Sequence, residues 1–215
     1  MTDADEAAER LIVDALRALT PDVPVVAEEM FAEDGAPEVA GGPFWLVDPL
    51  DGTKEFISRN GEFTVNIALI EAGRPVLGIV HGPAVGATYF AAEGAAFVVR
   101  NGGPARQIRA RRPAPDGVVA AVSRSHRTPE TDRFLADYKV KEERAAGSAL
   151  KFGIVAGGEA DIYPRLGRTM EWDTAAGHAV VAFAGGSVRT LDGAELVYGK
   201  PGFENPPFVV RGLDD

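Results

Sequence analysis

Two aspartates, Asp48 and Asp51, stand three residues apart directly after an apolar segment, in the string WLVDPLDGTKEF that begins at Trp45. The proline and glycine around them predict a turn, and a turn can aim both side chains at one point. Neighbouring carboxylates repel each other, so one stays protonated near neutral pH unless a cation lies between them. Oxygen ligands suit a hard ion such as Mg²⁺, with the backbone carbonyl of Leu50 as a further ligand.

Gly52 and Thr53 follow this turn, and we expect them to begin a short helix. The free N–H groups and the positive dipole end of a helix start favour a bound phosphate. A metal ion and a phosphate would then lie side by side. An Asp-Gly turn by itself needs no ligand, but turn formation does not require the strand, both acids and the threonine together.

Two further acidic segments are candidates to complete the metal site. Glu28 and Glu29 follow a predicted strand over residues 25–27, and alternation along a strand sends their side chains in opposite directions, so only one would face the site. Asp173 precedes a predicted helix over residues 174–183, where an aspartate also serves as an N-cap. Both segments gain significance because two acids alone do not complete an octahedral shell.

The composition excludes several other chemistries. The chain of 215 residues has no cysteine and three histidines, so disulfides, thiolate nucleophiles and cysteine-ligated zinc are excluded. Two residues separate Asp48 from Asp51, whereas aspartyl-phosphate phosphatases need one. The segment 193–200 does not fit a Walker loop, and no nucleophile elbow surrounds Ser125.

The overall charge and hydropathy predict where the protein works and what it binds. A formal net charge of −10 argues against binding to nucleic acid, whose recognition needs clustered Lys and Arg. No apolar run is long enough to span a membrane, and the acidic first residues differ from a secretory signal. We therefore expect a cytoplasmic protein without a transmembrane segment, whose partner is a small anionic molecule. The sequence leaves open whether it is a monomer or a homodimer.

The elements that must position these acids fall into two predicted halves. An amphipathic helix is expected over residues 3–19 and a loop over residues 32–42. The Gly-, Pro- and Arg-rich stretch 101–117 suggests a boundary, giving an N-terminal α+β half (1–117) with the acidic turn and a C-terminal α/β half (118–215). In the first half we expect strands over residues 25–27, 44–47, 63–70, 75–81 and 88–92, of which the last three form an antiparallel meander. In the second half we expect strands over 118–122, 160–163 and 187–190 and helices over 130–138, 149–156 and 174–183.

Taken together, these strings resemble the inositol monophosphatase superfamily, whose members carry an acid pair after a strand, then D-P-[IL]-D-G-T, then W-D at a helix start. DPLDGTKEFISRNGEFTVNIALI, GSALKFG and MEWDTAAGHAV are most similar to its bacterial 3'(2'),5'-bisphosphate nucleotidases. The resemblance covers nearly the whole chain. It implies an αβαβα layered sandwich of the sugar-phosphatase type and a lithium-sensitive, Mg²⁺-dependent enzyme that hydrolyses adenosine 3',5'-bisphosphate to AMP and phosphate.

The resemblance also implies roles for individual residues, with two Mg²⁺ ions and a third left open. The implied metal ligands are Glu28, Asp48, the Leu50 carbonyl, Asp51 and Asp173. Glu28 and Asp48 also count as catalytic, with Thr53 and Asp5 orienting or deprotonating the attacking water. The implied substrate-binding residues are Gly52, Thr53, His126, Ser148, Lys151, Arg165 and Asp173.

The N-terminus departs from the family pattern. Members usually carry a helical segment before a V-T-x-x-D string, whereas this chain starts MTDAD, so we expect that segment to be lacking. Thr2 and Asp5 also match a capping box, so Asp5 can serve simply to start the helix. Two alternatives stay open: a phosphatase of the same superfamily acting on inositol, sugar or histidinol phosphate, and a truncated chain that binds metal or nucleotide without turnover.

Overall fold

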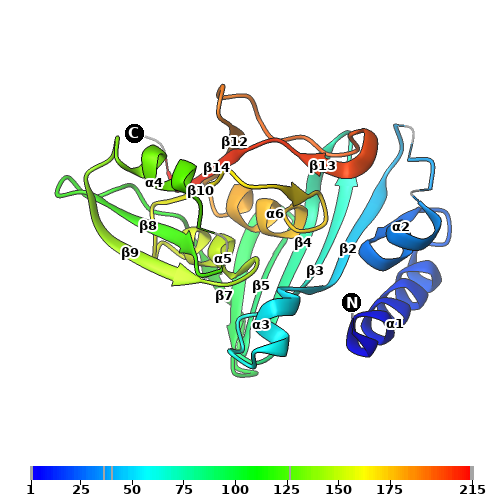
Figure 1. The fold of residues 1–215 in the computed structure, drawn as a ribbon. Coiled ribbons are helices and arrows are strands. Elements are labelled where there is room, and N and C mark those ends of the chain that lie inside the picture. Colours follow the sequence, from blue (N-terminus) through cyan, green and yellow to red (C-terminus); the bar gives the residue numbers. More distant parts are fainter. Residues whose placement is uncertain (1, 36, 40, 126, 214–215) are drawn as a thin grey trace.

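The first sheet holds the acidic turn at one of its inner strands (Figure 1). The computed structural model describes residues 2–35, 37–39, 41–125 and 127–213, and within these the sheet has the strand order β1-β2-β3-β4-β5-β6-β7. Only β1 and β2 pair in parallel, and the remaining neighbours are antiparallel. The elements are α1 (Asp3–Leu19), β1 (Val25–Ala27), α2 (Glu28–Asp34), β2 (Phe44–Asp51), α3 (Thr53–Ile57), β3 (Thr64–Glu71), β4 (Arg74–Gly82), β5 (Ala87–Ala92), β6 (Ala95–Arg100) and β7 (Arg106–Ile108).

The second sheet has the order β12-β14-β10-β8-β9 in the described part of the chain. Strand β8 lies parallel to β9 and β10, whereas β14 runs antiparallel to β10 and β12. A separate short pair joins β11 to β13. The elements are β8 (Val118–Ser123), α4 (Pro129–Leu135), β9 (Val140–Ala146), α5 (Leu150–Ala156), β10 (Ile162–Arg165), β11 (Thr169–Met170), α6 (Ala175–Phe183), β12 (Ser187–Thr190), a 3₁₀ turn (Pro201–Phe203), β13 (Glu204–Asn205) and β14 (Phe208–Arg211).

Strand β2 is buried on both faces because its side chains alternate between two hydrophobic cores. Trp45 and Val47 pack with Val13 and Leu16 of α1. On the other face, Leu46 belongs to the core that lies between the two sheets. The acidic turn at the end of β2 therefore rests on a strand that packing holds from both sides.

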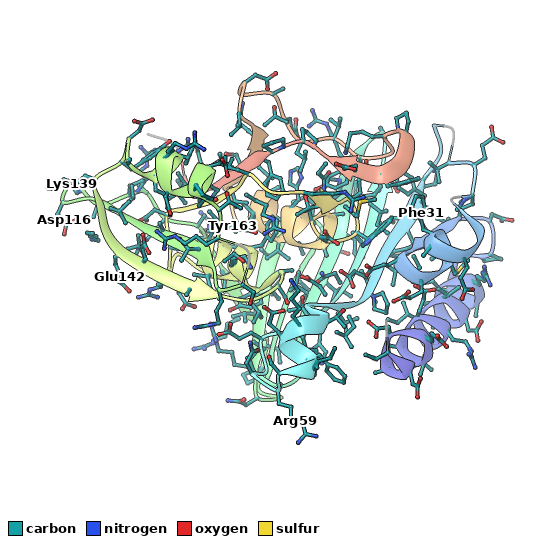
Figure 2. The ribbon with its side chains drawn as sticks, viewed as in Figure 1. Phe31, Arg59, Asp116, Lys139, Glu142 and Tyr163 are labelled. Atoms are coloured by element: carbon teal, nitrogen blue, oxygen red, sulfur yellow. The ribbon has the colours of Figure 1, made fainter. Side chains whose placement is uncertain are left out.

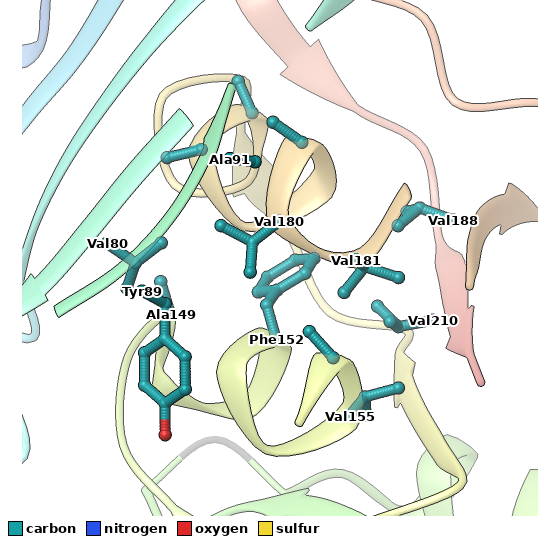
Figure 3. Packing of buried hydrophobic residues seen from close by; sticks show 14 of the residues in the cluster. Val80, Tyr89, Ala91, Ala149, Phe152, Val155, Val180, Val181, Val188 and Val210 are labelled. Carbon is teal, nitrogen blue, oxygen red and sulfur yellow. The ribbon is translucent and has the colours of Figure 1, made fainter. Parts of the chain in front are cut away.

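Helices α5 and α6 fill the space between the sheets. Figure 3 shows Phe152 of α5 facing Val180 of α6, between Val80 of the first sheet and Val210 of the second. Helices α1 and α2 cover the far side of the first sheet, and α4 packs on the outer side of the second. The resulting layers confirm the αβαβα sandwich that the sequence predicted.

The strand expected over residues 25–27 is confirmed, but the loop expected over residues 32–42 is wrong in its first residues. Residues 28–34 form helix α2, so the chain turns directly from β1 into a helix. Alternation along a strand consequently does not apply to Glu28 and Glu29, which are successive residues of one helical turn. Because β1 has three residues and α2 has seven, neither is long enough for hydrophobic periodicity to distinguish a strand from a helix.

Several strands were missing from the expected set. Strands β6 and β7 continue the meander up to and into the expected boundary stretch, and β9 and β14 complete the second sheet. Strand β9 reads VKEERAA, and its mostly exposed charged residues hide the strand from a hydrophobic pattern. Helix α4 ends at Leu135, earlier than residue 138.

The two halves share one hydrophobic core. Helix α6 of the second half packs on β3, β4 and β5 of the first sheet, and Ala176 and Ala179 stand in the same cluster as Val80. Gly78 on β4 allows this approach, since a Cβ there would meet the backbone of Ala176. Because the same core includes residues from both halves, the packing marks no boundary at residue 117. The division there stays a prediction.

Candidate active site

The acidic turn forms where the pairing of β2 with β3 shifts register between Asp48 and Asp51. Asp48 Oδ1 accepts the Leu50 N–H at 3.0 Å, which closes a side-chain turn two residues long. Gly52 follows with φ 92°, in the left-handed region, and α3 starts at Thr53 as expected. A Cβ at Gly52 would also collide with Ser148 Oγ, so both backbone conformation and space require glycine there.

The Asp51 carboxylate is held by both halves of the chain. Its Oδ2 accepts the Ala149 N–H at 2.6 Å, the Thr64 hydroxyl at 3.2 Å and the Asn66 amide at 3.4 Å. These three hydrogen bonds all reach the same oxygen, Oδ2. Thr64 and Asn66 are fully buried on β3, and sequence reasoning missed them. Two polar residues at alternate, inward-facing positions of a strand were the signal.

Four acids gather at this turn. Burial, and then the charges of neighbouring acids, raise the pKa of Glu28 to about 7 and that of Asp173 to about 8. The same causes raise the pKa of Asp48 well above its usual value. Asp48 lies close enough to Glu28 to affect its pKa, and the repulsion between the two carboxylates disfavours ionisation of both in the absence of a cation. Side chains that lie 145 positions apart in sequence are thus neighbours in the fold.

The helix that carries Glu28 is capped by Glu9, a residue that was not expected at the site. Glu28 is the first residue of α2, and the N-cap residue Ala27 has no side chain able to cap the helix. The buried Glu9 of α1 accepts the N–H groups of Glu29 and Met30 at 2.8 and 2.9 Å and acts as the cap instead. Sequence reasoning missed Glu9, because nothing local relates it to a helix nineteen residues later.

Asp173 is placed by a contact other than the expected helix cap. Thr174, one residue further on, is the N-cap of α6 and makes no side-chain cap bond. Asp173 Oδ2 accepts the Met170 N–H at 2.8 Å, which turns the carboxylate toward the other acids. The N-cap interpretation of Asp173 is therefore wrong.

The donor set fits Mg²⁺ by its chemistry. It consists of carboxylates and a backbone carbonyl, and the chain has no cysteine that could supply a thiolate. Within the described ranges, however, no three His, Asp or Glu side chains are already arranged to enclose an ion. Binding a cation would therefore require these side chains to close around it, in place of the protons that their raised pKa values favour.

A cavity of about 260 Å³ lies beside the acids, between the two halves. Asp51, Thr53 and Asp173 line it together with three cationic residues, Lys54, Lys151 and Arg165. A cavity lined by both acidic and basic side chains suits a negatively charged ligand that binds together with a metal cation.

Two of these cationic residues, Lys151 and Arg165, have nitrogen atoms that are buried from solvent. Lys151 is 3% exposed and donates to the carbonyl oxygens of Ser148 and Ala146 at 2.6 and 3.2 Å. Its Nζ lies 5.3 Å from the ring centre of Tyr163, at the middle of the molecule (Figure 2). Burial lowers the pKa of Lys151 to about 8, and the Asp51 carboxylate opposes that shift. The buried Nε of Arg165 has no partner within the described part of the chain, so it is available to a ligand.

Ser148 and Asp5, two further residues expected at the site, make hydrogen bonds within the protein. Ser148, at φ 48°, donates its hydroxyl to the carbonyl oxygens of Asp51 and Glu62, each at 2.8 Å. Asp5 closes the capping box of α1 through Thr2, and its charge adds to the raised pKa of Glu28. Among the residues described, the Asp5 and Thr53 side chains share no hydrogen bond. His126 lies outside them.

The sequence pattern of the family described as "Inositol monophosphatase family" matches residues 1–208. The chain belongs to the inositol monophosphatase family. As a member of it, the chain is a phosphatase. It is 49% identical over 213 residues to the "3'(2'),5'-bisphosphate nucleotidase CysQ" of Salmonella typhimurium, covering 98% of this chain and 84% of that protein.

Solved structures of inositol monophosphatase family members share the fold. CysQ of Bacteroides thetaiotaomicron, described as a bacterial member of the family, matches with a TM-score of 0.80 and 38% identity, covering 96% of this chain and 83% of that chain. The Thermotoga maritima IMPase matches with a TM-score of 0.78 and 30% identity, covering 98% and 78%. In the described residues, no helix is long and apolar enough to cross a membrane.

Proposed function

We propose that this phosphatase is a Mg²⁺-dependent 3'(2'),5'-bisphosphate nucleotidase that converts adenosine 3',5'-bisphosphate to AMP and phosphate. The observation that carries the proposal is a single cavity lined both by the acids Asp51 and Asp173 and by the cations Lys151 and Arg165. One phosphate would lie at the acids with its cations, and the second would pair with Lys151 and Arg165. The name of the Salmonella relative supports the same substrate.

The metal ligands in this proposal are Glu28, Asp48, the Leu50 carbonyl, Asp51 and Asp173, with two Mg²⁺ ions as the working number. Bound Mg²⁺ lowers the pKa of water and neutralises charge on a phosphoryl group. The raised pKa values of the acids support the assignment, since a cation replaces the protons that otherwise hold like charges together.

The chain itself would bind and orient the reactants. Thr53 lines the cavity beside Asp51, where its hydroxyl can orient a water molecule. Gly52, Thr53 and Lys54, around the start of α3, line the same cavity, and their N–H groups can donate to phosphate oxygens. The hydrogen bonds from Ala149, Thr64 and Asn66 keep Asp51 in one orientation, so little reorganisation is needed during reaction.

An inositol or sugar monophosphatase is the second candidate, supported by the 30% identity to the Thermotoga maritima IMPase. A monophosphate would leave the buried Lys151 and the unpartnered Arg165 Nε without a phosphate to bind. A substrate panel separates the two functions. Higher kcat/KM on inositol 1-phosphate than on adenosine 3',5'-bisphosphate would overturn the nucleotidase proposal.

Replacing Asp48 by asparagine tests the metal site. We expect Asp48→Asn to lower Mg²⁺-dependent phosphate release by about 10²-fold or more, because the amide removes a ligand charge. EDTA should abolish release by the unchanged protein. The matched control is Asp116→Asn, an exposed aspartate that pairs with Lys141 at the far end of the second half (Figure 2). Near-normal release by the Asp48 variant would contradict the proposed ligand set.

A further inference from the structure

Glu62, between α3 and β3, joins the two halves beside the cavity. Its carboxylate accepts Arg124 Nε at 2.7 Å and Arg124 Nη2 at 2.9 Å, as a bidentate pair. The same carboxylate accepts the Gly147 N–H at 2.8 Å. Arg124 follows β8 and Gly147 follows β9, so one acid of the first half holds the ends of two neighbouring strands of the second.

The residues proposed to bind the second phosphate lie near these strand ends. Strands β8, β9 and β10 are parallel, and ligands of such sheets bind at the carboxyl ends of the strands. Arg165 ends β10, and Lys151 lies on the helix that follows β9. A shift of this edge relative to the first half would therefore move both cations relative to the acidic turn.

A continuous chain of hydrogen bonds runs from the acidic turn to Lys151. Ala149 N–H reaches Asp51 Oδ2, Ser148 Oγ reaches the carbonyl oxygens of Asp51 and Glu62, and Lys151 Nζ returns to the Ser148 carbonyl. The joint is also close-packed, because a Cβ on Gly147 would come within 2.5 Å of the Glu62 carbonyl oxygen. The acidic turn and Lys151 are therefore linked through residues 147–149.

The ion pair is too exposed to act mainly as a stabilising contact. The Glu62 and Arg124 side chains are 21% and 48% exposed, and pairs of this kind contribute little to the free energy of unfolding. Its bidentate geometry and the added backbone N–H define orientation instead. Arg124 further donates to the Ala145 carbonyl at 2.9 Å, which extends the hold to β9 itself.

Resting on the proposed function, we propose that Glu62 is a positioning residue that sets the separation between the acidic turn and the cationic side of the cavity. That separation selects substrates by the distance between their two phosphates. A monophosphate occupies only the acidic side, so its hydrolysis does not depend on the separation. Glu62 thus determines specificity for bisphosphates without contacting the substrate.

The test compares adenosine 3',5'-bisphosphate with 3'-AMP, which offers the same 3'-phosphate and lacks the second one. In Glu62→Gln we expect kcat/KM for the bisphosphate to fall about tenfold to a hundredfold, mainly through KM, as for other small misplacements of binding groups. We expect kcat/KM for 3'-AMP to change less than about threefold and the half-saturating Mg²⁺ concentration to stay the same.

The matched control is Glu159→Gln, which breaks the Arg100–Glu159 pair, an ion pair that also joins the halves but does not line the cavity. It should leave both substrates unaffected. Arg124→Gln should reproduce the Glu62→Gln effect, and the double variant should be no worse than either single change. Gly147→Ala disturbs the same joint without removing a charge, so it gives an independent measurement if Glu62→Gln folds poorly.

The possible outcomes separate the inference from the proposed function. Equal losses on both substrates in Glu62→Gln, or a similar loss in Glu159→Gln, would overturn the positioning role while leaving the nucleotidase proposal intact. A wild-type protein that does not hydrolyse the bisphosphate in the presence of Mg²⁺ would overturn both.

Discussion

Burial decides the protonation states of single residues in this protein. Desolvation is the first cause of the raised pKa of Asp48 and Asp173 and of the lowered pKa of Lys151. The same cause acts on His178 of α6, which is 3% exposed and packs by the Tyr198 hydroxyl, 3.0 Å from its Nδ1. Its pKa falls to about 3 from 6.5. His178 is therefore neutral in the folded protein near neutral pH.

The buried histidine predicts a pH-dependent loss of stability on the acidic side. The unfolded chain protonates this residue below pH 6.5 while the folded protein does so only near pH 3, so its contribution is complete above 6.5 and is lost as pH falls. The loss reaches about 2 kcal/mol at pH 5. Urea unfolding of His178→Gln at pH 7 and pH 5 should show a weaker pH dependence by that amount. The exposed His81→Gln should match the wild type, and an unchanged slope in His178→Gln would refute the assignment.

The orientation of the site acids depends on contacts between different secondary-structure elements. Helix α2 lacks a side-chain cap of its own, and Glu9 on α1 supplies it. The contact also ties α1 to the start of α2, where Glu28 leaves the backbone. Loop 147–149 does the same for Asp51 from the other half.

Removing the cap supplied by Glu9 should weaken both stability and metal binding. We expect Glu9→Ala to lower the free energy of unfolding by about 1–2 kcal/mol, the usual cost of losing a helix cap with two N–H partners. Glu9→Gln should recover part of this, because an amide oxygen still accepts. The control is Asp14→Ala, an exposed position on the same helix. A higher half-saturating Mg²⁺ concentration in Glu9→Ala is expected, and a stability equal to that of Asp14→Ala would contradict the capping role.

For the molecule as a whole, the site lies where three layers meet. The first sheet contributes the turn, α2 contributes Glu28 from outside the sheet, and the segment before α6 contributes Asp173 from inside it (Figure 1). The chain carries a net charge of −10, and these clustered acids add local repulsion to that excess. Stability and cation binding should consequently be linked.

This linkage predicts opposite pH responses with and without Mg²⁺. The folded protein retains protons on Glu28 and Asp173 up to about pH 7 and 8, whereas the unfolded chain releases them from about pH 4, so stability in EDTA should fall as pH rises through this range. Each retained proton contributes a slope of about 1.4 kcal/mol per pH unit. Mg²⁺ binds the deprotonated acids, so its stabilising effect in thermal unfolding should be larger at pH 8 than at pH 5. A stabilisation independent of pH would argue against these ligands.

Much of the local structure was predictable because its causes are local. The capping box at Thr2 and the amphipathic spacing predicted α1, and the apolar run ending in Asp48 predicted β2 with its turn. The spacing of Asp48 and Asp51 also indicated the kind of ligand. Short or charged elements escaped prediction, as α2 and β9 show, since a few residues carry no clear period.

The sequence by itself determined which groups are available for chemistry: oxygen donors, no thiol, and a turn that presents two of them. Only the tertiary structure decided which groups meet. Ala149 and Asp51 are 98 positions apart, and the burial of Lys151 depends on a core shared by both halves. Residue order does not specify such distances, because they follow from how sheets and helices pack. Desolvation then shifts the pKa values, and it too exists only in the folded chain.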